Sequence, residues 1–314
     1  DIKISLSNEI GKVGLIEREN ATIINAALSK LAEEIIEAFQ KALLKLNISA
    51  PLYVSQNDGT LMLPEKVSSY PVLTFACGPT NSMRGAAFLS GIDESVIVDI
   101  GGTTSDIGYI KQGFPRQSAV ATDVGGVRTN FRMPDIVSIG LGGGSIIREN
   151  GKRIGPDSVG YLLTEKAKVF GGDTLTATDI AVARYNLDIG DPSLVKNIDK
   201  ELLENSKKEI TNLLEDSVDK MKTSSTEVPA IFVGGGTIIN QEKIKGISEL
   251  IIPDNFSVAN AVGAALGQVS GEVDRVFHYD KLGREKTIEV ASLEAKEIAK
   301  KAGASEKTIE VIEI

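Results

Sequence analysis

Apolar residues recur at helical spacing in two long segments of the chain. In residues 20–46 they come every three or four positions, with charged residues between them: Ile24, Leu28, Leu31, Ile35, Phe39, Ala42 and Leu46. Residues 199–221 are strongly charged, and their apolar positions share one side: Leu202, Leu203, Ile210, Leu213, Leu214 and Val218. This period predicts two long amphipathic helices, each with its apolar stripe turned towards a core.

Shorter apolar runs predict buried strands that end in turns. They lie in APLYVSQNDGTL, VIVDI and PAIFV, and YPVLTFA is a further short apolar run. Helices rich in small residues are predicted in CGPTNSMRGAAFLSG and ANAVGAALG, and the tail KTIEVASLEAKEIAKKAGASEKTIEVIEI has a strand, helix, strand pattern. Strands that alternate with helices indicate an α/β architecture.

One predicted strand breaks into glycines inside VIVDIGGTTSDIGYI, residues 96–110. Gly101 and Gly102 allow backbone N–H groups to approach an oxyanion, because no Cβ stands in the way. Thr103, Thr104 and Ser105 add hydroxyl donors at the same place. Polyphosphate is the common ligand of such a turn.

Two aspartates, Asp99 and Asp106, flank this break. Carboxylates repel phosphate, so if they face the site they hold Mg²⁺ through water or orient an attacking water. The structural alternative is a tight hairpin with two solvent-facing aspartates.

Two further glycine clusters follow. Gly234, Gly235 and Gly236 stand in VGGGTII at the carboxyl end of an apolar strand, where α/β folds place ligand crevices. They fit either an adenosine-binding backbone or a plain turn. GLGGGSI, which begins at Gly140, is either a third ligand-facing loop or a flexible β-turn.

Composition narrows the classes of partner. Lys and Arg number 34 against 43 acidic residues, so the net charge of −9 argues against a nucleic-acid surface or an anionic membrane as partner. Cys77 is the single cysteine, which excludes an intrachain disulfide and favours a reducing cytoplasm. A zinc cluster or a Ser-His-Asp triad would depend on the single histidine, His278.

The ends of the chain also carry information. No run approaches 18 apolar residues, and the first residues lack the basic start and apolar core of a signal peptide. The chain begins at Asp1 and passes almost at once into sequence typical of folded protein. We therefore expect a fragment of a longer protein whose upstream part is missing.

The order of these parts resembles the actin, sugar-kinase and heat-shock-chaperone ATPase superfamily. In its second lobe a connecting helix, a phosphate hairpin, an adenosine loop and a second connecting helix follow one another, as GPTNSMRGAAFLSG, VIVDIGGTTSDIGYI, AIFVGGGTII and ANAVGAALG do here. Within that superfamily, the motif sequences most closely resemble those of the hydantoinase/oxoprolinase family, the ATP-dependent N-methylhydantoinases and 5-oxoprolinases. That resemblance rests on LSNEIGKVGLIERENATIINAAL, APLYVSQNDGTLM, DIGGTTSDIG, VGGVRTNFRMPDIVSIGLGGGSI and GGDTLTATDIAV.

The resemblance implies an actin-like, ribonuclease H-like α/β fold in three parts. Residues 1–75 would be the C-terminal part of the first lobe and residues 76–271 the second lobe, followed by a strand-helix-strand extension at 272–314. Members carry a first phosphate hairpin near the N-terminus, and nothing before Asn57 resembles it. ATP turnover by this piece alone is therefore not expected.

The resemblance also assigns roles in binding ATP and Mg²⁺. Asp99 would lie near Mg²⁺ through water, and Asp106 would support the turn. The phosphate contacts would come from the turn and the adenosine contacts from the later glycines: Gly101, Gly102, Thr103 and Thr104, then Gly234, Gly235 and Gly236.

The substrate side is defined less sharply. Arg128, Asn130 and Arg132 in GGVRTNFRMP suit a carboxylate or imide oxygen, since guanidinium groups bind planar groups in a bidentate fashion, but surface or ion-pair roles are the alternative. Asn57 and Asp58 point either into a cleft or into an Asx turn. His278 is expected at the surface, and Cys77 is expected to be buried.

The function implied is ATP-dependent opening of a small cyclic amide, a hydantoin or 5-oxoproline, or the ATP-binding subunit of such an enzyme acting with a second subunit. A small-metabolite kinase and a nucleotide-switched binding protein remain as alternatives, because the same cleft serves both.

Overall fold

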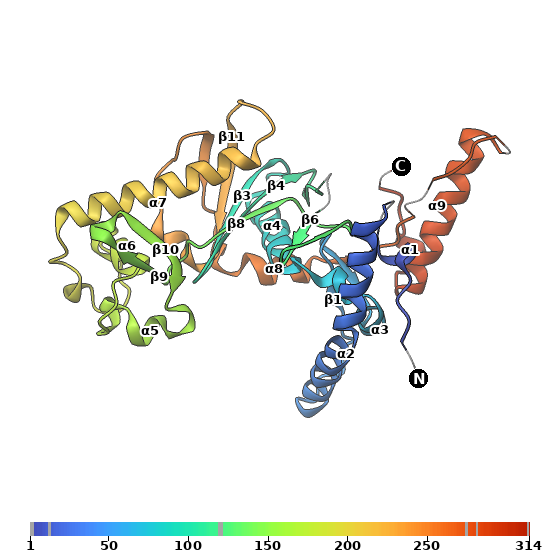
Figure 1. The fold of residues 1–314 in the computed structure, drawn as a ribbon, viewed down its shortest axis with the longest axis horizontal. Helices are drawn as coiled ribbons and strands as arrows, with labels where there is room; N and C mark the ends of the chain where they lie inside the picture. Colours follow the sequence, from blue (N-terminus) through green and yellow to red (C-terminus); the bar gives the residue numbers. More distant parts are fainter. Residues whose placement is uncertain (1–2, 12–13, 119–121, 274–275, 281, 313) are drawn as a thin grey trace. The chain divides into compact units, whose positions relative to one another are not determined.

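The structure, a computed structural model, describes residues 3–11, 14–118, 122–273, 276–280, 282–312 and 314 (Figure 1). The chain forms two compact units. Unit 1 comprises Asp1–Cys77, Gln117–Pro134 and Gly267–Ile314, and unit 2 comprises Gly78–Arg116 and Asp135–Leu266. The segment 117–134 and the C-terminal tail thus join the N-terminal region in one unit, a grouping that the linear pattern does not reveal.

Unit 2 is built on a mixed sheet. Its strand order is β12 (Ile247–Ile251), β11 (Val228–Val233), β3 (Ser95–Ile100), β4 (Ser105–Lys111) and β5 (Phe114–Pro115), and β8 (Ile136–Ile139) also pairs with β4. Strands β12, β11 and β3 are parallel, whereas β3, β4, β5 and β8 form antiparallel pairs. The predicted strand, glycine turn and strand are therefore confirmed as the β3–β4 hairpin.

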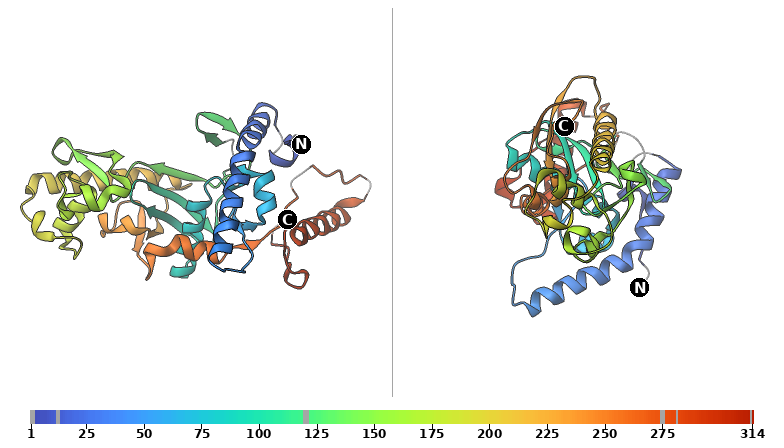
Figure 2. Two further views of the ribbon diagram at one scale, coloured as in Figure 1. Left: turned by 90° about the horizontal axis from the view of Figure 1, so that it is seen from below. Right: turned by 90° about the vertical axis from the view of Figure 1, so that its left-hand side faces the viewer.

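Helices cover both faces of this sheet (Figure 2). On one face, α6 (Ala177–Tyr185) and α7 (Lys200–Met221) pack on Val96, Val98 and Phe232. On the other, α4 (Cys77–Ser90) and α8 (Ala259–Ala265) pack on Ile97 and Ile231. Alternate residues of β3 and β11 therefore enter opposite cores, which explains why these strands are apolar at nearly every position.

The remaining elements of unit 2 are short. They are β9 (Ser145–Arg148), β10 (Arg153–Ser158), α5 (Leu163–Lys166), η2 (Glu149–Gly151), η3 (Gly160–Leu162), η4 (Lys168–Phe170), η5 (Pro192–Leu194), η6 (Gly235–Ile239) and η7 (Phe256–Val258). Thr176 begins α6 with a capping box, because its side chain accepts from the N–H of Asp179 while the Asp179 carboxylate accepts from the N–H of Thr176.

Unit 1 has little sheet. Strands β1 (Val54–Ser55) and β2 (Thr60–Met62) are antiparallel, and β13 (Gln268–Val269) runs parallel to β2. A separate hairpin joins β6 (Thr122–Val124) and β7 (Val127–Thr129). The helices are α1 (Ser7–Ile10), α2 (Ile16–Lys45), α3 (Pro64–Ser69), η1 (Pro71–Thr74), α9 (Gly283–Lys301) and η8 (Glu306–Thr308).

The long helix α2 is confirmed, but its predicted inner face is wrong. The buried positions are Ala21, Asn25, Ser29, Ala32 and Ile36. From the predicted stripe, Leu31 is 52% and Phe39 57% exposed. The small, partly polar face is buried because α3 and η1 present backbone groups to it: Asn25 donates to the carbonyl of Ser69 and accepts from the N–H of Val72.

The C-terminal tail also differs from its prediction. Residues 286–290, expected as a strand, lie inside α9, and the described residues after η8 form neither helix nor strand. The run KTIEV continues directly into Ala, Leu, Glu and Lys, which are strong helix formers, and helix propagation is much easier than nucleation. Among the described residues, no helix combines the length and hydropathy that a bilayer crossing requires.

Candidate functional site

The β3–β4 hairpin places the two predicted aspartates opposite each other. Asp99 and Asp106 are register partners, and the turn between the strands closes when the N–H of Gly101 donates to the carbonyl of Thr104 at 2.9 Å. Gly102, Thr103 and Thr104 are exposed, and a Cβ added at Gly102 would meet no atom within 4 Å. The tip of the turn is therefore open.

The 140–145 segment, here named the support loop, packs directly against this turn. The N–H of Gly143 donates to the carbonyl of Gly101 at 3.0 Å, and that of Gly144 donates to the carbonyl of Gly102 at 2.7 Å. A Cβ at Gly142 would lie 2.6 Å from the nitrogen of Thr103, so only glycine allows this approach. The support loop therefore fixes the turn through its carbonyl groups.

This packing fixes the direction of the turn's amides. In a trans peptide the carbonyl and the following N–H point in opposite directions. Because the carbonyls of Gly101 and Gly102 are directed to the support loop, the N–H groups of Gly102 and Thr103 are directed the opposite way. Two donors that share a direction at an exposed glycine turn form an anion-binding arrangement.

Two other residues, Ser105 and Thr178, secure the support loop. The buried hydroxyl of Ser105 donates to the carbonyl of Leu141 at 2.6 Å, so it is an anchor and not one of the expected hydroxyl donors to a ligand. Thr178 donates to the carbonyl of Gly143 through both its N–H and its hydroxyl. The stretch GGDTLTATDIAV therefore has a structural role, because it caps α6 and anchors the support loop.

The three glycines after β11 divide into two kinds. A Cβ at Gly234 would collide with the Asp99 carboxylate, and a Cβ at Gly236 would collide with the carbonyl of Gly101. A Cβ at Gly235 would meet no atom within 4 Å, so this glycine alone faces open space. Gly234 and Gly236 are explained by close packing on the hairpin, and the assignment of all three to adenosine remains a prediction.

Burial raises the pKa of both aspartates. For Asp99 a hydrogen bond from Ser82 opposes the rise and the neighbouring charge of Asp106 adds to it. For Asp106 a hydrogen bond from Ser138 opposes the rise. Two facing, partly buried carboxylates suit a divalent cation, which would offset both the burial and the mutual repulsion.

The residues present fit Mg²⁺ in one particular mode. In the described part of the chain, no group of three or more His, Cys, Asp or Glu side chains is arranged to hold a metal ion. Mg²⁺ typically keeps several waters and takes one or two carboxylates together with substrate phosphates. Asp99 and Asp106 beside an anion-binding turn match that donor set, and Asp99 would be the residue that holds the ion.

The two small-residue helices, α4 and α8, approach each other at backbone distance. A Cβ at Gly85 of α4 would collide with the carbonyl of Ala259, and a Cβ at Gly263 of α8 would collide with the carbonyl of Asn81. The crossing brings Asn260 to α4, where its Nδ2 donates to Ser82 Oγ at 3.2 Å. Ser82, Ser138 and Asn260 were missed from sequence, since no spacing marks a lone Ser or Asn as a carboxylate partner.

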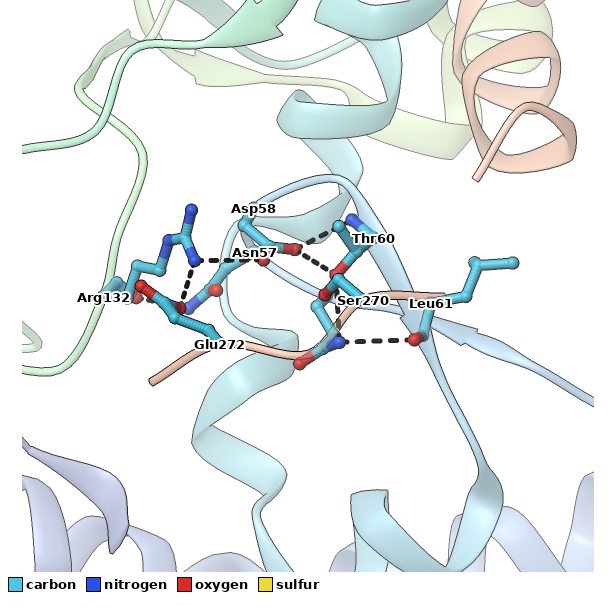
Figure 3. Close-up of polar contacts among 8 residues, drawn as sticks. Asn57, Asp58, Thr60, Leu61, Arg132, Ser270 and Glu272 are labelled. Atoms are coloured by element: carbon cyan, nitrogen blue, oxygen red, sulfur yellow. Dashed lines mark hydrogen bonds and ion pairs between the residues drawn. The ribbon is translucent and has the colours of Figure 1, made fainter. Parts of the chain in front are cut away.

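The three predicted substrate residues do not converge. Arg128 is paired with Glu17, its Nε lying 3.7 Å from the carboxylate, and Asn130 lies against the backbone at Gly11 and Gly14. Arg132 forms ion pairs with Asp58, at 3.4 Å, and with Glu272 (Figure 3). Their substrate role remains a prediction, and for Arg132 the structure shows the ion-pair alternative.

Asn57 and Asp58 lie in the same polar cluster of unit 1. Asn57 donates to the carbonyl of Arg132, and Asp58 accepts from the N–H of Thr60 at 2.8 Å and from its hydroxyl at 2.6 Å (Figure 3). The Asx-turn alternative is therefore the one that forms. Burial lowers the pKa of nearby Lys66, and the charges of Asp58 and Glu272 oppose that shift.

The single histidine and the single cysteine differ in exposure. His278 is exposed, as expected. Cys77 is half-buried at the first position of α4, which corrects the expectation of a fully buried thiol.

Comparison with known proteins identifies the family. The model of the hydantoinase/oxoprolinase family matches residues 18–191, more than half of the chain. The chain belongs to the hydantoinase/oxoprolinase family. The matched range includes most of α2, the β3–β4 hairpin, the support loop and α6, and it ends before β11 and the glycines that follow it.

Two curated relatives of this family member are enzyme subunits. Caprolactamase subunit alpha from Pseudomonas jessenii is 27% identical over 264 residues, which cover 79% of this chain and 36% of the relative. The acetophenone carboxylase gamma subunit from Aromatoleum aromaticum is 27% identical over 181 residues, covering 55% of this chain and 24% of the relative. The chain thus spans about a quarter to a third of these proteins.

Two solved structures share the fold. The ATP-dependent caprolactamase from Pseudomonas jessenii superposes with a TM-score of 0.70 and 19% identity, covering 95% of this chain and 48% of that one. Nucleotide-free acetone carboxylase superposes with a TM-score of 0.67 and 19% identity, covering 91% and 46%. The predicted α/β, actin-like ATPase fold class is confirmed.

Proposed function

We propose that this chain is part of an enzyme that uses ATP to activate and open a cyclic amide, and that the β3–β4 hairpin binds the nucleotide's phosphates. One observation carries the proposal. The support loop binds the carbonyls of Gly101 and Gly102, which directs the N–H groups of Gly102 and Thr103 towards the open tip, and two partly buried aspartates face each other in the adjoining strands.

Each residue of the hairpin has a role in this proposal. The N–H groups of Gly102 and Thr103, with the hydroxyls of Thr103 and Thr104, would bind phosphate oxygens. Asp99 would hold Mg²⁺ through water and Asp106 would keep the turn in place and contribute negative charge. The metal would neutralise charge on the transferred phosphoryl group. Gly235 would leave room for the nucleoside.

The chemistry explains why a cyclic amide requires ATP. Resonance makes the lactam carbonyl a poor electrophile, and transfer of the γ-phosphoryl group to its oxygen produces a phosphorylated imidate and ADP. Water then adds to the carbon, the ring C–N bond breaks with protonation of nitrogen, and a second water releases phosphate from the acyl phosphate. The sum is lactam, ATP and two waters giving amino acid, ADP and phosphate.

A second candidate follows from the relatives. Acetophenone carboxylase and acetone carboxylase are named for ketones. A ketone's enol oxygen accepts a phosphoryl group as a lactam oxygen does, so the same hairpin would serve both reactions. The lactam is favoured because the caprolactamase alpha subunit matches the larger share of this chain.

The setting of the reaction is part of the proposal. Both curated relatives are subunits, which supports action with a second, different subunit. Use of Mg-ATP and a single cysteine fit the cytoplasm. The lactam itself, whether a hydantoin, 5-oxoproline or a simple ring such as caprolactam, would be chosen by residues that the hairpin does not supply.

The test is a substrate screen with the full-length protein and its partner subunit. ADP release would be measured with hydantoins, 5-oxoproline, caprolactam and ketones with bicarbonate. Lactam-dependent ADP release with ring-opened product is expected. Ketone-dependent release supports the carboxylase alternative, a stable phosphorylated product supports a kinase, and slow ATP hydrolysis that no small molecule stimulates supports a nucleotide-switched binding protein.

A further inference from the structure

A chain of hydrogen bonds connects Asp99 with both helices of the α4–α8 crossing. Ser82 on α4 is 1% exposed and donates its hydroxyl proton to the Asp99 carboxylate. The same oxygen accepts from Nδ2 of Asn260 on α8, at 3.2 Å, and this Nδ2 also donates to the carbonyl of Gly78 at 2.8 Å. Helix α4 thus supplies Ser82 and helix α8 supplies Asn260 to this series of hydrogen bonds.

The hydrogen bond between Asn260 and Ser82 depends on the glycines where α4 and α8 cross. Gly85 and Gly263 allow the two backbones to approach so closely that a Cβ on either would collide with a carbonyl of the other helix. Asn260 follows Ala259, whose carbonyl lies against Gly85. The register of the crossing therefore determines whether Asn260 reaches Ser82.

Asp99 also packs against β11 and the glycine that follows it. One of its carboxylate oxygens lies against Gly234, whose missing side chain leaves just enough room. Val233 is its register partner in β11, so the backbone of Asp99 is held by the sheet. The contacts with Gly234 and with Ser82 together set the orientation of this carboxylate.

We propose that Ser82 and Asn260 are positioning residues that orient Asp99 towards the divalent cation of the bound nucleotide. This inference rests on the proposed function, because it takes the hairpin as the nucleotide site. Hydrogen-bond partners of metal-binding groups typically change metal affinity by about 10–100-fold when removed. A displacement of α8 along α4 would break the contact between Asn260 and Ser82, so the helix crossing and metal binding are coupled.

The experiment measures binding of ADP to the full-length protein by calorimetry, with and without Mg²⁺. The ratio of the two affinities is the gain from Mg²⁺. Ser82→Ala and Asn260→Ala should each lower this gain about 10-fold and leave metal-free ADP binding unchanged, since the phosphate donors are backbone groups elsewhere. Their effects should not add, because both act through one hydroxyl.

Matched controls separate positioning from folding. Ser90→Ala removes a hydroxyl from the same helix that donates to the carbonyl of Ala86, and Asn205→Ala removes an exposed amide that donates to the carbonyl of Asn150. Both should keep the full gain. Asn260 is exposed, so its variant tests the inference even if Ser82→Ala unfolds.

Other results would overturn either the positioning role of Ser82 and Asn260 or the proposed function itself. A full Mg²⁺ gain in Asn260→Ala, or equal losses with and without the metal, would overturn the positioning role. Absence of any nucleotide binding by the unmodified protein would overturn the proposed function and this inference with it.

Discussion

The two units differ in how they use their apolar residues. Unit 2 has one large buried cluster between its sheet and α6 and α7, and a second between the sheet and α4 and α8. The described residues of unit 1 form two clusters of four buried hydrophobic residues each, while long stretches of α2 expose theirs. Periodicity identifies a helix in both units, but it identifies the buried face only where a sheet lies opposite.

The candidate site lies in the unit with the larger core. Rigid packing from both faces holds β3 and β11, and this allows the support loop and Gly236 to approach the turn at backbone distance. In unit 1, by contrast, segments far apart in sequence are joined by a polar cluster of Asn57, Asp58, Arg132 and Glu272 (Figure 3).

A matched pair of phenylalanines tests the comparison most directly. Phe232→Ala in β11 removes a fully buried ring and should lower the free energy of unfolding by about 3–5 kcal/mol. Phe39→Ala removes an exposed ring of α2 and should stay within about 0.5 kcal/mol. Urea unfolding measures both, and a comparable loss for Phe39→Ala would mean that the α2 stripe is covered in the intact protein.

Asp99→Asn should separate activity from stability. Loss of the charge that holds Mg²⁺ through water should reduce Mg-ATP turnover by about 100-fold. The pKa of Asp99 is raised by burial and by Asp106, so the neutral side chain should leave the melting temperature unchanged or raise it by about 2–4 °C for each kcal/mol relieved. Unchanged turnover in the full-length protein would exclude the metal role.

The glycines after β11 should respond in opposite ways. Gly236→Val drives a side chain into the carbonyl of Gly101 and should destabilise unit 2 by about 1–3 kcal/mol. Gly235→Val points into open space and should weaken nucleotide binding with little change in melting temperature. Thermal unfolding and nucleotide titration distinguish the two, and unchanged ATP affinity in Gly235→Val would count against adenosine at this position.

The polar cluster of unit 1 should contribute more than a surface ion pair. Arg132→Ala removes the ion-pair partner of the largely buried Asp58 and should destabilise unit 1 by about 1.5–3 kcal/mol. The matched control is Arg153→Ala, whose exposed pair with Glu149 should contribute about 0.5 kcal/mol or less. If Arg132 also contacts the substrate, Arg132→Ala would raise KM for the lactam. If its role is purely structural, the variant protein that remains folded would keep the unmodified KM.

The smallest expected effect concerns alkaline pH. Burial, followed by the hydrogen bond to Glu9 and its charge, raises the pKa of Tyr70 to about 12 from the ordinary value of 10.0. Between these values the unfolded chain loses the phenolic proton and the folded one keeps it, so stability is retained below pH 10 and falls as pH rises towards 12. Unfolding measured across this range should show a smaller decline in Tyr70→Phe, and an equal decline would exclude this residue as the cause.

Much of the site was predictable because it lies within one short stretch. Asp99, Asp106 and the turn are adjacent in sequence, so strand period and glycine placement were sufficient to predict the hairpin. Ser82 and Asn260 were not predictable, since they lie 178 positions apart and meet only through the crossing of α4 and α8. Ser105 illustrates the same limit: its hydroxyl belongs to the motif, but its partner is the carbonyl of Leu141.

The α/β pattern, the hairpin and the family could be predicted from the sequence, because each depends on local period or on residues in fixed order. The folded structure was needed to show which glycines serve packing and which face open space, which side of α2 is buried, and that Arg132 pairs with Asp58 and Glu272. These outcomes depend on which backbone and which charge lie opposite a residue. Linear order does not record that, because contacts between distant segments form only when the chain has folded.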